Sequence, residues 1–116
     1  MGNTDGDPLG GRALGWVSWK YGAQSWAIWE MDFNSLRAWM YADTYTEHEN
    51  GNVQNGQGFL VYRGETMGLD EPDASIRLKL MRRGSQDYGY FWLLSQKSGG
   101  KQKADSLNQT TKLWDS

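Results

Sequence analysis

The chain has 116 residues, a formal net charge of −2 and no cysteine. This length fits one domain with a modest core. The charges are mixed and form no basic stripe of the kind that binds nucleic acid. The lack of cysteine excludes disulfides, thiolate chemistry and cysteine-ligated metals, and no stretch is long and apolar enough to span a membrane. Only 38% of the residues are hydrophobic, so the core must depend on aromatic side chains.

The first part of the chain is predicted to form a loop, a helix and a strand. Residues 1–11 are rich in Gly, Asp and Asn, which is typical of a loop. Residues 12–21 fit a short helix, because their apolar side chains fall on one side and Gly22 can end it. Residues 25–33 are bulky and apolar on both faces, which favours a covered parallel strand.

The middle of the chain is polar. Residues 44–58 contain almost no apolar side chain and two Asn-Gly turn dipeptides, so they are predicted to form a long loop. Such a loop in a compact domain is often functional or disordered. Residues 59–63 follow as a short strand between two glycines.

Residues 75–94 are the longest stretch that favours a helix. Asp73 or Ser75 can cap it, and Gly84 is an unfavourable interior residue. Its predicted apolar face and flanks comprise Ile76, Leu78, Leu80, Met81, Tyr88, Phe91 and Trp92, and its predicted solvated face comprises Arg77, Lys79, Arg82 and Arg83. The helix is expected to end near residues 98–100. The polar residues 101–116 are expected to be a tail or a marginal helix.

This helix also carries a long motif. Its residues are Ser75-Ile76-Arg77-Leu78, Arg83-Gly84 and Asp87-Tyr88-Gly89-Tyr90-Phe91-Trp92-Leu93-Leu94. The motif resembles the closing helix of the glycoside hydrolase family 123-like catalytic domain, also known as domain-of-unknown-function family 4091. Gly89 departs from the family pattern, in which an acidic residue is usual.

The resemblance extends over residues 3–94. Its further matches are Asp5-Gly6, Arg12, Gly15-Trp16, Trp19, Tyr21-Gly22, Trp29, Asn55-Gly56-Gln57-Gly58 and Tyr62. Gln57 stands where the family has an acid, and Arg63 where it has a proline.

The resemblance implies an α/β fold, namely the C-terminal βα portion of a (β/α)8 barrel with the order helix, strand, long loop, short strand, helix. Residues 1–98 would form this barrel segment and residues 99–116 a polar tail. A complete barrel needs eight strands and about 250 residues. The chain is therefore expected to be part of a larger protein or, as the alternative, a small α+β domain.

The family resemblance implies retaining hydrolysis of an N-acetylhexosaminide. Such enzymes use the acetamido group of the substrate as the nucleophile, supported by an adjacent aspartate-glutamate pair. In the family that pair lies on an earlier strand, so no catalytic residue is expected in this chain. Asp70-Glu71 is adjacent by composition only and is interpreted as an acidic lead-in to the helix. The lone His48 is interpreted as a solvated loop residue rather than a metal ligand.

Four residues are candidates for substrate binding. Glu30 and Asp32 share one face at the C-terminal end of the presumed barrel strand, where barrel enzymes collect their site residues. They would contact a substrate hydroxyl or amide, or else bind backbone or water at the strand end. Trp29 points to the other face, either under the helices or into the mouth. Tyr62 would line the same mouth or pack in the core.

Three functional hypotheses follow. The chain is a segment of a glycoside hydrolase-like enzyme acting on N-acetylhexosamine-containing glycans, a non-catalytic carbohydrate-binding module, or a structural remnant. The expected ligand is carbohydrate, and neither nucleic acid nor a membrane is expected to bind. The expected protein partner is either a second copy of the chain or the remainder of the barrel. The glycines form no phosphate-binding pattern. No cofactor is expected, and no metal either, because the chain has a single His and no Cys. The compartment is left open, a secreted or periplasmic parent protein being one alternative.

Overall fold

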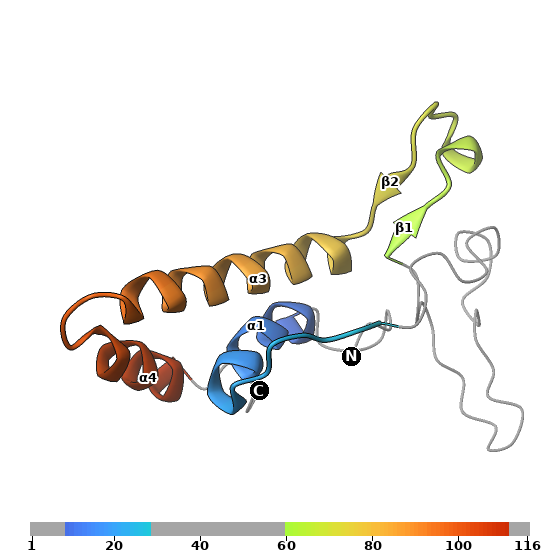
Figure 1. Ribbon diagram of the computed structural model, residues 1–116. Helices are drawn as coiled ribbons and strands as arrows, with labels where there is room; N and C mark the ends of the chain where they lie inside the picture. Colours follow the sequence, from blue (N-terminus) through green and yellow to red (C-terminus); the bar gives the residue numbers. More distant parts are fainter. Residues whose placement is uncertain (1–8, 29–59, 112–116) are drawn as a thin grey trace, which may run out of the picture. The chain divides into compact units, whose positions relative to one another are not determined.

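The computed structural model describes residues 9–28 and 60–111. The described residues are mainly helical, with one small sheet (Figure 1). The elements are α1 (Leu9–Tyr21), β1 (Val61–Tyr62), the 3-10 helix η1 (Gly64–Met67), β2 (Asp73–Ala74), α3 (Ile76–Ser95) and α4 (Gly100–Thr111). This content is compatible with a small α/β or α+β domain. In the described ranges, no helix combines the length and hydrophobicity that a membrane crossing requires.

The chain divides into two compact units. The first unit comprises Met1–Pro8 and Ala27–Lys79, and the second comprises Leu9–Trp26 and Leu80–Ser116. The second unit therefore contains α1, α4 and most of α3, whereas the first contains the sheet and the first turn of α3.

Helix α1 confirms the predicted N-terminal helix, although it begins three residues earlier than expected. Gly22 has φ +65° and ends it. The Gly22 N–H donates to the carbonyl oxygen of Trp19 at 3.3 Å, and the Ala23 N–H donates to that of Ser18 at 2.9 Å. These two hydrogen bonds form a Schellman motif, which turns the chain back after α1.

The strand predicted for residues 25–33 is not formed in its described part. Residues 25–28 have no regular secondary structure, and residues 29–33 lie outside the described residues. The prediction assumed barrel strands on both sides of this stretch. In the described residues β1 pairs with β2 instead, because the short return through η1 brings these two strands together in antiparallel register, with Val61 opposite Ala74 and Tyr62 opposite Asp73.

Helix α3 confirms the predicted main helix. The Oγ of Ser75 accepts a hydrogen bond from the Leu78 N–H at 3.3 Å, so Ser75 is the N-cap that the sequence suggested. The Ser75 N–H also donates to the carbonyl oxygen of Leu60 at 2.9 Å, which joins the start of α3 to the residue just before β1. The helix ends at Ser95, a few residues before the predicted stop.

The predicted apolar face of α3 is correct at its centre and wrong at its ends. Met81 and Phe91 are buried, but Ile76 is 60% exposed and Trp92 is 52% exposed. Conversely, Arg77 was expected on the solvated face and is buried. The cause is the limited reach of the elements that cover α3. Helix α1 packs against Phe91, whereas at the start of α3 Arg77 is buried because it contacts Tyr62 of the hairpin. The basic residues Arg82 and Arg83 are exposed, as predicted.

Residues 100–111 form helix α4, so the helical alternative for this region is the one that the structure adopts. The helix packs against α1. Ala104 is completely buried, and Asn108 is buried as well. The Nδ2 of Asn108 donates to the carbonyl oxygen of Trp16 at 2.9 Å. The polar composition hid this packing, because one small residue and one hydrogen-bonded amide make the contact rather than a run of large apolar side chains.

Two glycines allow α1 and α3 to approach closely. A Cβ atom built on Gly84 would collide with the backbone carbonyl of Arg12, and one built on Gly15 would collide with the carbonyl of Gly84 itself. Because a backbone atom cannot move aside as a side chain does, both positions require glycine. The helix-destabilising effect of Gly84 is therefore offset by close helix packing.

We expect Gly84→Ala to lower the free energy of unfolding by about 1–3 kcal/mol, as overpacking in a filled interior does. Gly89→Ala is the matched control, because Gly89 lies in the same helix and its added Cβ meets open space. The control should raise the free energy of unfolding by up to about 1 kcal/mol through better helix propensity. Urea unfolding followed by circular dichroism measures both. A stabilised Gly84→Ala variant would contradict the close approach.

Phe91 is the main aromatic contact between α3 and α1. Its ring meets the Trp16 ring edge-on, with centroids 4.8 Å apart, and lies 5.5 Å from the ring of Trp19. Tyr88 also contacts Trp19, with ring centroids 5.5 Å apart. Of the three aromatic residues predicted on the apolar face of this helix, Tyr88 and Phe91 pack against α1. Trp92 is exposed instead.

Phe91→Ala is expected to cost about 3–5 kcal/mol, which is comparable with the whole stability of a small domain. Trp92→Ala, one residue further along the same helix, should change the free energy of unfolding by less than about 1 kcal/mol because Trp92 is exposed. Thermal melts of both variants test this pair. Equal losses would show that α3 is packed on a different face.

Candidate functional site

Of the four predicted substrate-binding residues, only Tyr62 can be placed. Trp29, Glu30 and Asp32 lie outside the described residues, as does His48. The structure therefore neither brings these residues together with Tyr62 nor separates them from it.

Tyr62 is half-buried on β1 and interacts with Arg77 on the first turn of α3. The Nη2 of Arg77 donates to the Tyr62 hydroxyl oxygen at 2.9 Å. The guanidinium carbon also lies 5.9 Å from the centre of the tyrosine ring, within the range of a cation–π contact. The hydroxyl, which serves as an acceptor here, is held in place by this contact, so Tyr62 is oriented by its neighbour rather than free to rotate.

The most strongly connected polar cluster consists of Arg12 and Trp16 on α1 and Asp87 on α3. The Asp87 Oδ2 accepts hydrogen bonds from Arg12 Nε at 2.6 Å and from Trp16 Nε1 at 2.7 Å, and its Oδ1 accepts from Arg12 Nη2 at 3.1 Å. The arginine thus binds the carboxylate with two nitrogens, the strong geometry for this pair. The Asp87 side chain is only 16% exposed.

The environment of Asp87 has opposing effects on its ionisation. Burial by itself raises the pKa of the carboxyl group. The hydrogen bonds from Arg12 and Trp16 and the charges of Arg12 and Arg83 together lower it by more, so the net pKa lies below its ordinary value. The same contact raises the pKa of Arg12. Asp87 is therefore an ionised acceptor with its oxygens occupied, which suits it to fastening helices rather than to transferring protons.

Sequence reasoning missed this cluster. The three residues all belong to the motif, but no charge pattern links positions 12 and 87, which are far apart in the chain. The only signal was that separate pieces of one motif contained an arginine, a tryptophan and an acid.

A second acid–tryptophan contact fastens α4. The Asp105 Oδ1 accepts from Trp19 Nε1 at 3.0 Å, and its Oδ2 pairs with Lys101 Nζ at 3.0 Å. The hydrogen bond from Lys101 lowers the pKa of the Asp105 carboxyl, burial opposes this shift, and the hydrogen bond from Trp19 and the charge of Lys101 support it, so the net pKa is lowered. The ion pair is solvent-exposed, so it contributes little by itself.

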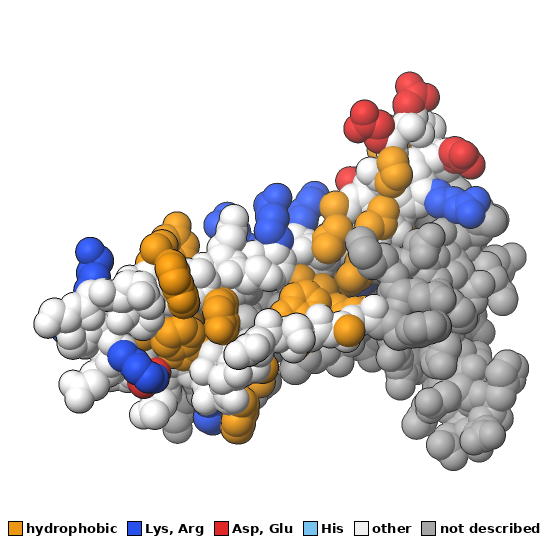
Figure 2. Space-filling model, viewed as in Figure 1, with side chains coloured by type: hydrophobic (Ala, Val, Ile, Leu, Met, Phe, Trp, Pro, Cys, Tyr) orange, Lys and Arg blue, Asp and Glu red, His pale blue; other side chains and the backbone are white. Residues whose placement is uncertain are grey.

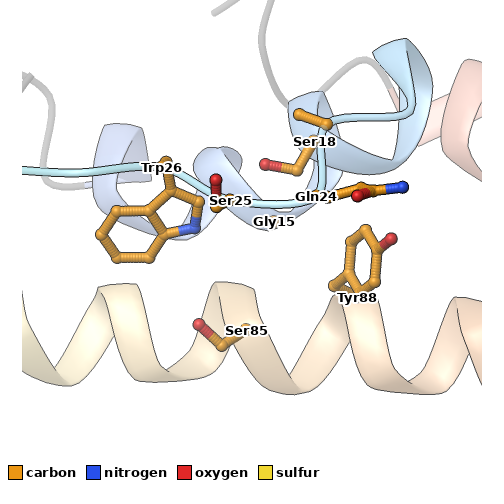
Figure 3. A pocket seen from close by; sticks show the side chains of 8 residues that line it. Gly15, Ser18, Gln24, Ser25, Trp26, Ser85 and Tyr88 are labelled. Carbon is orange, nitrogen blue, oxygen red and sulfur yellow. The ribbon is translucent and has the colours of Figure 1, made fainter.

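The second unit also contains a hollow of about 270 Å³. Its lining consists of Gly15, Ser18, Ala23, Gln24, Ser25, Trp26, Ser85 and Tyr88. Figure 3 shows the indole of Trp26 and the ring of Tyr88 toward opposite ends of this space, with Ser85 pointing from α3 between them. The Schellman turn after α1 positions residues 23–26 over α3, so the hollow is formed by local structure that the sequence does specify.

The lining of this hollow is aromatic and polar but carries no acidic or basic side chain. It can therefore offer ring surfaces and hydrogen bonds, but it has no carboxylate for acid–base catalysis. Sequence reasoning did not single out Trp26 as a site residue. No local pattern shows that Trp26 faces uncharged residues of α3, because only the fold brings them together.

The remaining candidates carry no chemistry in the described residues. Asp70 and Glu71 are exposed in the turn before β2, so the acidic pair precedes a strand and not the helix itself. Acidic side chains gather at this tip of the hairpin (Figure 2). Within the ranges that the structure covers, no group of three or more His, Cys, Asp or Glu residues could hold a metal ion.

The formal N-glycosylation sequon Asn108-Gln109-Thr110 is also engaged in packing. The Asn108 side chain is 1% exposed, and its Nδ2, the atom that a glycan would modify, donates to Trp16. Glycosylation is therefore incompatible with the folded contact between α4 and α1.

No protein-family model matches the chain, and a search of curated proteins found no match either.

The Asp87 cluster gives the fold a defined acid response. Because the folded-state pKa of Asp87 is lowered, its stabilising contribution is present above the unfolded pKa near 4 and is lost as the pH falls through the folded value. Asp87→Asn should reduce the free energy of unfolding at pH 7 by about 1–3 kcal/mol. The difference from the native chain should shrink as the pH falls below about 4.

Urea unfolding at several pH values between 7 and 2 measures this difference. Asp70→Asn is the control, because Asp70 is exposed and should change stability by less than about 0.5 kcal/mol at pH 7. A difference between native chain and Asp87→Asn that is constant over the whole pH range would argue against an ionised Asp87 in the folded state.

Proposed function

We propose that the chain is the C-terminal segment of a glycoside hydrolase-like protein that acts on N-acetylhexosamine-containing glycans. In this proposal it supplies the last helices of a (β/α)8 barrel and residues at the substrate mouth, but not the catalytic acid pair. Hydrolysis would depend on an aspartate-glutamate pair contributed by an earlier strand of the barrel.

The observation that carries the proposal is the cluster of Arg12, Trp16 and Asp87. These residues come from two separate stretches of the motif that resembles the glycoside hydrolase family 123-like domain, and they are joined by three hydrogen bonds. A coincidental resemblance would not require distant motif positions to bind one another. Gly15 and Gly84, two further positions of the same motif, are the site of the close helix approach. The motif therefore describes one packed helix pair, which supports its use as a guide to the barrel.

The substrate-binding part of the proposal depends on Tyr62 together with Trp29, Glu30 and Asp32. Tyr62 is favoured because the contact from Arg77 orients its ring and hydroxyl group before any ligand binds, and preorganised side chains lose less entropy on binding. A glycan would stack on the tyrosine ring.

The test is a titration of the isotope-labelled 116-residue chain with chromogenic N-acetylgalactosaminide and N-acetylglucosaminide, with NMR shifts and chromophore release measured together. We expect saturable shifts at residues 60–77 and no release of chromophore. Tyr62→Ala should weaken this binding several-fold, whereas Tyr90→Ala, which truncates an exposed tyrosine on α3, should leave it unchanged.

Two results would contradict the proposal. Chromophore release that survives purification and disappears in Glu30→Gln would mean that the chain itself is catalytic. Absence of any shift at residues 60–77 would remove the substrate-mouth role.

A second candidate function is that of a non-catalytic carbohydrate-binding module. The uncharged aromatic hollow of the second unit favours it, because that hollow offers binding groups without catalytic ones. Under this alternative, shifts would occur around the hollow but not around Tyr62.

A further inference from the structure

We propose that the hollow lined by Trp26, Tyr88, Ser18, Gln24 and Ser85 binds one neutral saccharide ring. None of the substrate-binding residues predicted from the sequence lines it. The site rests on the second candidate function above and names its ligand class, and it does not depend on the proposed substrate mouth around Tyr62. The argument depends on the shape, the charge and the unused hydrogen-bonding groups of the hollow.

The aromatic groups provide the apolar part of the site. Trp26 is 44% exposed and faces the hollow, which leaves ring surface available for stacking. The Tyr88 ring is held by its edge-on contact with Trp19. A pyranose ring presents C–H groups on its faces and hydroxyl groups around its edge, so two aromatic rings with polar groups between them complement it.

The polar groups of the hollow are available for a ligand. In the part of the chain that the structure describes, the side chains of Ser18, Gln24 and Ser25 form no hydrogen bond, and neither does the indole N–H of Trp26. The Ser85 hydroxyl donates to the carbonyl oxygen of Met81 at 3.2 Å, which leaves its oxygen free to accept. Donors and acceptors of both kinds are what a polyhydroxylated ligand requires.

The charge and size of the hollow restrict the ligand class. None of its eight lining residues carries a charge, so an ionic ligand would lose hydration without gaining an ion pair. The volume of about 270 Å³ is slightly below the range of about 300–1,000 Å³ typical of pockets for drug-sized molecules. One ring therefore fits better than an extended oligosaccharide or a peptide segment.

The experiment is an NMR titration of the native chain with methyl β-glucoside and methyl β-N-acetylglucosaminide, each up to about 50 mM. Glucuronic acid tests whether a charged sugar binds. Phenol tests whether an aromatic ring without the hydroxyl groups of a sugar binds instead. We expect saturable shifts at the Trp26 indole and at residues 15–26 and 85–88 for the neutral sugars, with millimolar dissociation constants of the order that a few unburied contacts provide. Glucuronic acid should bind more weakly.

Trp26→Ala should weaken binding of the neutral sugars at least tenfold, and Gln24→Ala should weaken it about twofold to fivefold, as expected for loss of a stacking ring and of one hydrogen-bonding group. Trp92→Ala is the matched control, because it removes an exposed tryptophan that does not line the hollow, and it should leave the affinity unchanged. Circular dichroism melts verify that each variant is folded. Gln24 is exposed after α1, so Gln24→Ala should fold normally and can decide the test even if Trp26→Ala does not fold.

Three outcomes would overturn the proposal: no saturable shift with either neutral sugar, tighter binding of phenol than of the sugars at the same residues, or equal losses in Trp26→Ala and Trp92→Ala. Shifts at residues 60–77 alone would also overturn it while supporting the substrate mouth around Tyr62. Shifts at the hollow alone would support it while contradicting the proposed function, so the two failures are distinguishable.

Discussion

The packing of the second unit depends on a single carboxylate. Asp87 accepts hydrogen bonds from Arg12 and Trp16, and this fixes the rotation of α1 about its axis relative to α3. With that rotation set, the glycine pair lies at the closest approach of the helices and Phe91 contacts the tryptophan rings of α1. Asp87 is only 16% exposed, and a largely desolvated acid that loses its partners is costly. Packings of α1 that would leave Asp87 unpaired are therefore disfavoured.

Helix α4 extends the same arrangement through its own contacts with α1. The two tryptophans that meet Phe91 also serve α4: Trp19 donates its indole N–H to Asp105, and the backbone carbonyl of Trp16 accepts from Asn108. Each half-buried tryptophan thus packs its ring against Phe91 and donates its indole N–H to a carboxylate, Asp87 for Trp16 and Asp105 for Trp19. The low apolar content of the chain is compensated by aromatic residues that make two kinds of contact.

The functional proposals depend on different parts of this structure. The proposal of a glycoside hydrolase-like protein is supported by motif residues that contact one another in the helices. In that proposal Tyr62, which accepts a hydrogen bond from Arg77, would belong to the substrate mouth. The saccharide site in the hollow depends on neither: it follows from the uncharged lining and from the turn at Gly22 that brings Trp26 opposite Tyr88. Neither proposal assigns a catalytic residue to this chain.

By itself the sequence determined the local structure: the two helices α1 and α3, the glycine that ends α1, the serine that caps α3 and the short strand that contains Tyr62. These features depend on neighbouring residues, so periodicity and capping chemistry reveal them. Only the tertiary structure decided which faces are buried. Arg77 lies inside because Tyr62 receives it, Trp92 lies outside because α1 does not reach it, and the polar residues 100–111 form a packed helix because α1 offers Asn108 a carbonyl oxygen. Such outcomes depend on partners distant in the chain, and no local sequence pattern shows that Arg12 contacts Asp87, which lies 75 positions away.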